Sequence, residues 1–199
     1  MAVEDPRQRL LDAAIAHVTD HGMTDLSLRG LAAELGTSHR MLSHHFGSKE
    51  GLWVAIVQEV ERRQLEAIAE LVPDPSTPFP EAMRAWWRHI SDPSLWPSER
   101  LFFEVYGQAL RRRPSSGTLL DGIVDSWVGA ATELGQAMGM PADEARAAAR
   151  LGLAVTRGLL LDLVATEDRA GVDEAMEHWI ALNESARGAD GAPSTGSQR

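Results

Sequence analysis

The segment from Leu26 to Trp53, LSLRGLAAELGTSHRMLSHHFGSKEGLW, constrains the fold more than any other part of this chain. Ser27 can cap a short helix whose leucines recur at helical spacing. Gly36 can end that helix, because glycine takes the left-handed conformation at little cost. Ser38 can cap a second short helix, and a long third helix is expected to begin at Lys49. The pattern predicts two short helices joined by a tight turn and held against a longer one.

The remaining sequence is also helical in pattern, with no convincing run of the alternation that is typical of strands. Four prolines in residues 72–80 exclude a helix there and predict a linker or turn. Other prolines and glycines divide the chain into expected helices at about 6–21, 28–35, 39–46, 49–71, 81–90, 99–113, 118–138, 142–166 and 172–186. We expect an all-α fold with three parts: a helix-turn-helix domain (1–52), a helical dimerisation and ligand-binding domain (53–187), and a disordered tail (188–199).

Composition narrows the function classes. The net charge of −10 argues against a protein that coats nucleic acid through bulk charge, but residues 27–49 carry a local charge of +2. Without cysteine there is no disulfide framework and no thiolate metal site. No apolar run is long enough for a membrane span, and the acidic, polar N-terminus is unlike a signal peptide, so we expect a cytoplasmic protein. No catalytic motif is found, so an enzyme is not expected, and neither is a cofactor or a metal site.

The helix-turn-helix pattern extends into a longer match. Residues from Arg9 to Trp53, RLLDAAIAHVTDHGMTDLSLRGLAAELGTSHRMLSHHFGSKEGLW, resemble the tetracycline-repressor (TetR) family of transcriptional regulators. The positions that carry this resemblance are Gly22, Ser27, Leu31, Ala32, Gly36, Ser38, Leu42, His45, Phe46, Lys49 and Leu52. The resemblance implies a DNA-binding regulator, and we expect a repressor, although the sequence also allows an activator because it encodes binding and not its consequence.

Two positions depart from the family pattern. Thr37 stands where the family usually has valine after the turn glycine, and Ser43 stands where it usually has a tyrosine that contacts phosphate. Ser43 either makes a shorter contact or leaves that task to His44. Together with the acidic net charge, this departure keeps open a second reading, in which a ligand-binding helical dimer carries a degenerate DNA-binding module.

Candidate DNA contacts follow from residue chemistry and from the resemblance. Arg40 is the best candidate to contact a base edge, because a guanidinium can donate to both acceptors of guanine. Lys49 and His44 are candidates to hold phosphates, which fixes register without reading sequence. The complete set of candidates is Ser27, Arg29, Ser38, His39, Arg40, Met41, Ser43, His44 and Lys49.

The second domain is expected to supply a dimer and a ligand pocket. Residues 118–166 contain two long helices, the second apolar around nearly its whole circumference, and we expect a homodimer through this region, against the alternative of a helix central to a monomer core. An aromatic cluster suits an unknown small apolar or aromatic effector, with plain core packing as the alternative. The candidate ligand-binding residues are Met83, Trp86, Trp87, Trp96, Phe102, Phe103, Tyr106 and Trp127, with polar contacts expected from Arg84, Arg88, His89 and Glu104.

Overall fold

The computed structural model describes residues 5–21, 27–71, 76–111 and 117–190, and in these ranges every regular element is a helix. The elements are α1 (Pro6–His21), α2 (Leu28–Glu34), α3 (His39–Phe46), α4 (Lys49–Leu71), α5 (Phe79–Ile90), a 3₁₀ turn η1 (Pro93–Leu95), α6 (Trp96–Arg111), α7 (Gly117–Ala137), α8 (Ala142–Thr166) and α9 (Arg169–Asp190). The prediction of an all-α fold is confirmed for this part of the chain.

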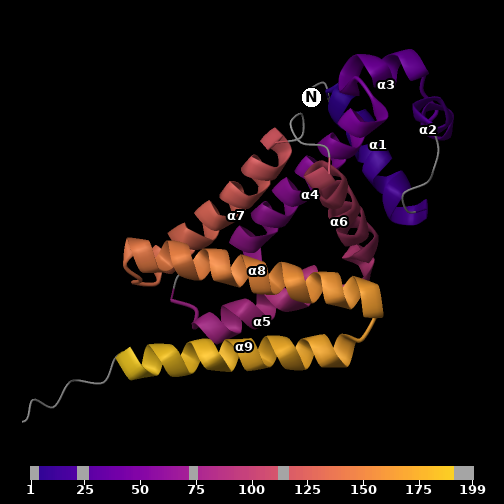
Figure 1. Cartoon of the computed structure of the whole chain (residues 1–199). Coiled ribbons are helices and arrows are strands. Elements are labelled where there is room, and N and C mark those ends of the chain that lie inside the picture. The colour runs from indigo at the N-terminus through magenta and orange to yellow at the C-terminus, as the bar shows by residue number, and fades with distance from the viewer. Residues whose placement is uncertain (1–4, 22–26, 72–75, 112–116, 191–199) are drawn as a thin grey trace, which may run out of the picture.

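Helices α1, α2 and α3 form one end of the molecule, packed on the start of α4 (Figure 1). Their shared core is apolar and consists of Leu11, Ala14, Val18, Leu28, Leu31, Ala32, Leu42 and Phe46, together with Leu52, Trp53 and Ile56 of α4. This is the expected arrangement, in which the inner faces of the two short helices lock onto a longer scaffold helix.

The other end of the molecule is built from α5 to α9 around the continuation of α4 (Figure 1). Helix α7 lies along α8 and also contacts α4 and α6, while α9 packs against α5 and α8. Trp127 of α7 and Phe102 of α6 belong to the same apolar cluster as the core of the N-terminal helices. The predicted boundary at residues 52 and 53 therefore falls inside α4, a continuous helix that runs through both parts.

Several helix ends differ from the sequence-based expectation. Helix α5 begins at Phe79 and α6 at Trp96, so that Pro80 and Pro97 lie in their first turns, where the missing N–H of proline has no intrahelical partner to lose. Helix α9 is longer than predicted at both ends. Gly22, residues 72–75 of the proline-rich segment, Arg112, Arg113 and the end of the predicted tail lie outside the described residues.

A polar cluster joins α1 to α4. Glu59 is buried and accepts hydrogen bonds from Arg62 Nη2 at 2.8 Å and from Arg63 Nε at 2.8 Å. Arg63 also pairs with Asp12 of α1. The Arg62 hydrogen bond is the main cause that lowers the pKa of Glu59 to about 2.

Within the described residues, no helix is both long and apolar enough to cross a bilayer.

Candidate functional site

The helix-turn-helix geometry follows from the local sequence. The Ser27 hydroxyl accepts a hydrogen bond from Gly30 N at 3.1 Å and caps α2, and the Ser38 hydroxyl accepts one from Met41 N at 3.1 Å and caps α3. Gly36 has a φ of +62°, as the turn requires. Leu42 and Phe46 are the buried residues of α3, which leaves the rest of its surface facing outward.

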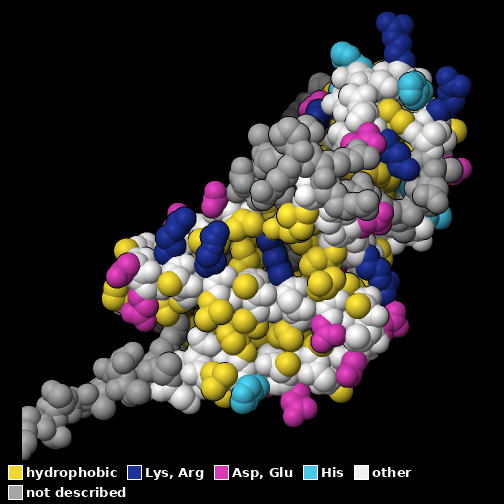
Figure 2. Space-filling model, viewed as in Figure 1, with side chains coloured by type: hydrophobic (Ala, Val, Ile, Leu, Met, Phe, Trp, Pro, Cys, Tyr) yellow, Lys and Arg dark blue, Asp and Glu magenta, His cyan; other side chains and the backbone are white. Residues whose placement is uncertain are grey.

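The candidate DNA-contacting side chains lie on that outward surface. Arg29, His39, Arg40 and His44 are exposed, and Met41 keeps 43% of its surface accessible despite its apolar side chain. Figure 2 shows basic and histidine side chains projecting from the end formed by α1–α3. Ser27 and Ser38 are also exposed, and their hydroxyl oxygens already accept hydrogen bonds from the first turns of α2 and α3. A phosphate that contacts them would accept a hydrogen bond from a hydroxyl that also caps a helix.

Ser43 and Lys49 have particular surroundings. Ser43 is half-buried, and its Oγ lies 3.4 Å from Nε2 of His39 one turn earlier. Lys49 begins α4 and is half-buried, with Nζ 5.8 Å from the centre of the Trp53 ring. A cation held over an aromatic ring near a helix start lies where anions are favoured. Lys49 thus lies at the start of α4, three residues after the last residue of α3.

Two glycines that the sequence reasoning overlooked fix α3 against α4. Gly47 ends α3 with a φ of +75°, which strains any other residue. Gly51, in the first turn of α4, passes so close to α3 that a Cβ atom there would lie 2.1 Å from the backbone oxygen of Phe46. The only signal in the sequence was a glycine placed inside an expected helix, where it costs stability without a packing reason.

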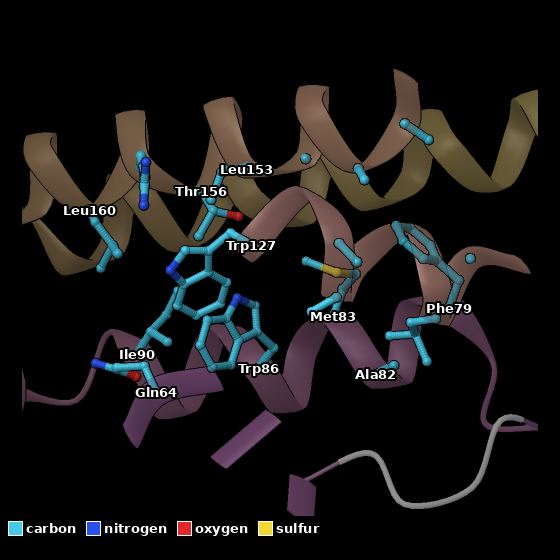
Figure 3. A pocket seen from close by; sticks show the side chains of 18 of the residues that line it. Gln64, Phe79, Ala82, Met83, Trp86, Ile90, Trp127, Leu153, Thr156 and Leu160 are labelled. Atoms are coloured by element: carbon cyan, nitrogen blue, oxygen red, sulfur yellow. The ribbon is translucent and has the colours of Figure 1, made fainter. Parts of the chain in front are cut away.

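A cavity of about 180 Å³ lies inside the C-terminal part, bounded by residues from α4 to α9. In Figure 3 the indoles of Trp86 and Trp127 lie together below α8, with Gln64 and Ile90 toward one end and Phe79 and Ala82 toward the other. The two indole ring centres are 5.4 Å apart. Since an engineered apolar cavity of about 150 Å³ holds benzene, this volume suits a small apolar body.

The structure divides the candidate ligand-binding residues into two groups. Met83, Trp86, Phe102, Phe103 and Trp127 line the cavity. The other three are Trp87, Trp96 and Tyr106, which lie outside the lining.

Each of those three side chains has partners elsewhere. The Trp87 indole donates to Asp173 Oδ1 of α9 at 2.6 Å, and the Trp96 indole donates to the Ser91 carbonyl at 3.1 Å. The Tyr106 ring lies tilted against that of Phe102, with ring centres 5.4 Å apart. The Trp87 contact joins α5 to α9, whereas these contacts of Trp96 and Tyr106 are with residues close in sequence.

The polar groups of the cavity are different from those expected. Arg84 pairs on the surface with Glu177, and neither Arg88, His89 nor Glu104 lines the cavity. The polar side chains that line the cavity come from four helices. They are Glu61 and Gln64 of α4, Glu99 of α6, Thr156 and Arg157 of α8, and Asn183 of α9. In the sequence these residues look like ordinary polar residues on the solvent-facing sides of amphipathic helices, so no pattern identified them as cavity residues.

Glu61 is the centre of a network that joins three helices. Its carboxylate accepts a hydrogen bond from Nε1 of Trp127 on α7 and another from Nη2 of Arg157 on α8, the latter at 3.2 Å. Burial raises the pKa of Glu61 above its usual value, and the charge of Arg157 opposes that shift. Trp127 and Arg157 are therefore both hydrogen-bonded to α4 through one carboxylate.

Glu99 is the most buried carboxyl of the cavity, with 7% of its surface exposed. It accepts a hydrogen bond from Gln64 Nε2 at 3.0 Å. Burial raises the pKa of Glu99 to about 8, with the nearby charge of Glu61 acting in the same direction and Arg157 against it. The described residues contain no cluster of His, Cys, Asp and Glu that could hold a metal ion.

Comparison with known proteins agrees with the N-terminal geometry. Residues 10–56 match the family model described as bacterial regulatory proteins, tetR family. The transcriptional repressor AcnR of Corynebacterium glutamicum is 34% identical over 64 residues, which are 32% of this chain and 34% of AcnR. The match thus spans about a third of the length of the curated relatives.

Solved structures agree with the whole fold. A TetR transcriptional regulator from Legionella pneumophila superposes with a TM-score of 0.69 at 16% identity, covering 92% of this chain and 99% of that one. The multidrug binding protein EbrR, solved in complex with imidazole, superposes with a TM-score of 0.66 at 24% identity, covering 90% of both chains. Residues 10–56 therefore belong to the tetR family of bacterial regulatory proteins, and the chain has the fold of solved TetR regulators.

Proposed function

We propose that this protein is a transcriptional regulator that binds a palindromic DNA operator as a homodimer and is released from it by a small ligand with an apolar or aromatic body. One observation carries the proposal: the outward surface of α3 bears Arg40 and His44, and the same α4 that packs on α3 also lines the cavity. Repression is the simplest consequence, since a dimer seated on an operator obstructs transcription.

Arg40 is proposed to read a base edge, with help from His39, Met41 and Arg29, while Lys49, Ser27 and His44 hold phosphates. The role of Ser43 is limited by its short side chain and by its contact with His39. One recognition helix with a local charge of +2 supplies little affinity. Two copies that bind half-sites about 34–36 Å apart, or a multiple of that distance, supply enough.

We place the dimer contact on α8 and α9. The sequence predicted a homodimer through residues 118–166, of which α7 contacts α4, α6 and α8 within the protomer while several of its residues stay exposed. Both α8 and α9 carry large apolar side chains that are exposed in the protomer. On α8, Leu151 is 59% and Leu161 is 49% exposed, and on α9, Leu182 is 56% exposed. Figure 2 shows hydrophobic side chains gathered over these two helices. Patches of this kind on an otherwise polar surface mark protein–protein contacts.

Leu151→Glu tests this interface. A carboxylate on the exposed apolar face of α8 should shift the protein from dimer to monomer at micromolar concentration, measured by light scattering, and should abolish operator binding. Leu110→Glu is the matched control, because Leu110 is 52% exposed and belongs to α6, not to either helix of the proposed interface. An unchanged dimer in Leu151→Glu would place the contact elsewhere.

For release, we propose that a ligand in the cavity repositions α4 through Glu61 and Gln64, the two cavity residues that α4 contributes. Such coupling requires that the ligand bind one position of α4 more tightly than the other. The tilt of α4 would then change the separation of the two recognition helices. The EbrR structure supports a small-molecule site in this fold, since that protein was solved with imidazole bound.

The decisive experiment is selection of bound sequences from random double-stranded DNA by the purified protein. We expect a palindromic sequence with half-sites about one helical turn, or a multiple of it, apart. Recovery of no sequence above background would contradict the proposal and favour a ligand-binding dimer with a degenerate DNA-binding module.

A further inference from the structure

The cavity contains more negative than positive ionisable groups. Glu61 of α4 and Glu99 of α6 line it, against a single guanidinium, that of Arg157 on α8. Among the described residues that line it, α5, α7 and α9 contribute no titratable side chain. Since buried charges require partners, the balance of these three groups determines which ligand charge the cavity accepts.

Arg157 is already neutralised. Its Nη2 donates to Glu61 at 3.2 Å, and its guanidinium lies 4.9 Å from the ring centre of Phe102 and 5.9 Å from that of Tyr106. Its side chain is only 18% exposed. An anionic ligand would have to compete with Glu61 for this cation, so Arg157 does not make the cavity an anion site.

Glu99 is the carboxyl that lacks a cation. Its hydrogen bond comes from Gln64, whose side chain is itself buried, with 7% of the residue exposed. The amide oxygen of Gln64 is buried and has no hydrogen-bond partner. A buried acceptor without a donor is costly. Glu99 and Gln64 together therefore offer acceptors to a group that carries both positive charge and N–H donors.

The remaining lining suits the body of such a ligand. Trp86 and Trp127 present two indoles with centres 5.4 Å apart, and Phe103 and Met83 add further apolar surface. Aromatic faces attract cations as well as apolar groups.

We propose that the cavity selects an organic cation, namely a protonated amine or amidinium on a small aromatic or apolar body. Its charge lies against Glu99, and one of its N–H groups donates to Gln64 Oε1. This inference rests on the proposed function, in which the cavity is the effector site, and it names the chemical class of that effector.

Binding of the cation should release a proton from the protein. The raised pKa of Glu99, about 8, keeps its carboxyl protonated at neutral pH, with Glu61 and Arg157 as the charged groups that act on it. When the cation binds, the Glu99 proton passes to the buffer and an ion pair forms. Linkage then requires that cation affinity rise about tenfold per pH unit below that pKa.

The test uses three probes that share one ring system: 1-naphthylmethylamine, which is a cation at neutral pH, 1-naphthylmethanol, which is neutral, and 1-naphthoate, which is an anion. Isothermal titration calorimetry at pH 7 should show the amine binding at least about tenfold more tightly than the alcohol, and the anion most weakly. Repeating the titration in two buffers of different ionisation enthalpy should show close to one proton released per amine bound.

Glu99→Gln removes the proposed partner of the cation while keeping its shape. In this variant the preference for amine over alcohol should fall to near parity, and the proton release should disappear. Glu66→Gln is the matched control, an exposed carboxyl of α4 outside the cavity lining, and it should behave as the unchanged protein. Thermal melting of both variants checks that they fold, and the proton count in the unchanged protein tests the proposal without any variant.

The outcomes separate this inference from the proposed function. Equal binding of amine and alcohol, with release of selected DNA by both, would overturn the cation preference and leave the regulator intact. Tight amine binding without any effect on DNA would support the cation preference and contradict the effector mechanism. If none of the probes binds at millimolar concentration, the cation proposal is wrong.

Discussion

Stability should depend on pH through Glu99 in a way that is unusual for a carboxyl group. The folded protein holds the Glu99 proton up to a pKa of about 8, whereas the unfolded chain releases it near the ordinary value of 4.5. Between these two values the native state binds more protons than the unfolded state, so the free energy of unfolding falls as pH rises. The stabilisation is fully present below about pH 4.5 and is lost as pH passes through 8.

The size of the effect follows from the two pKa values. At about 1.4 kcal/mol per pKa unit, the interval from 4.5 to about 8 corresponds to an upper limit of roughly 5 kcal/mol. Water that enters the cavity solvates the ionised carboxylate and raises the effective dielectric constant, so we expect about half of that limit. Glu59 acts in a separate window, because its pKa, lowered to about 2, stabilises the protein above about pH 4.5, and that stabilisation is lost as pH falls from about 4.5 through 2.

The assay is urea unfolding of the unchanged protein and of Glu99→Gln at several pH values from 5 to 8.5, at one fixed protein concentration. Near pH 5 the two should have similar stability, since a protonated carboxyl and an amide are alike in shape and charge. Near pH 8.5 the variant should be the more stable by about 2 kcal/mol. Titrating groups that do not interact with Glu99 cancel in the difference. A difference that stays constant across this range would refute the argument that Glu99 is protonated in its cavity.

Three further predictions concern the DNA-binding end. Arg40→Ala should cost about 1–3 kcal/mol on the selected operator and much less on unrelated DNA, and equal losses on both would exclude it as a base reader. Lys49→Ala should weaken binding to all sequences and make the salt dependence about one unit shallower, whereas an unchanged slope would remove Lys49 from the phosphate contacts. Gly51→Ala should push α4 away from the Phe46 carbonyl, lowering the unfolding free energy by about 1–2 kcal/mol and operator affinity by more than tenfold; a variant as stable and as tight-binding as the original would contradict the close contact.

Local rules predicted the helix-turn-helix closely. Ser27 and Ser38 cap the helices expected of them, and Gly36 takes the positive φ that its place after α2 requires. These features depend on residues within one helical turn of each other, so the sequence contains all the information needed. The apolar positions of α2 and α3 likewise follow from helical spacing.

The cavity could be predicted only in part, because its polar groups meet through tertiary packing. Glu61 and Arg157 are separated by 96 residues yet share a hydrogen bond. Each looks on its own helix like an ordinary surface charge. Gln64 and Glu99 pair across 35 residues in the same way. Which charges become buried depends on how α4, α6 and α8 cross, and helical spacing carries no information on that crossing.

Aromatic clustering pointed to the part of the chain that forms the cavity, but it did not distinguish the side chains that line it from those that do not. Trp86 and Trp87 are adjacent, so they point about 100° apart on α5. One lines the cavity and the other donates to Asp173 of α9. The sequence shows that aromatic residues are concentrated here, whereas the face each one occupies depends on the position of α9.

Because α4 is one continuous helix, a tilt at its cavity end displaces its other end, next to α3. Glu61 follows Lys49 by 12 residues on the same helix, which places them about 18 Å apart along its axis. A tilt of about 5° centred on Glu61 would displace the start of α4 by about 1.6 Å, given that arm. Gly51 lies in close contact with the Phe46 carbonyl at the end of α3, so α3 would move together with the start of α4. A shift of that size exceeds the tolerance of a hydrogen bond between an arginine and a base, so in the proposed mechanism a tilt of α4 by a few degrees is enough to break operator recognition.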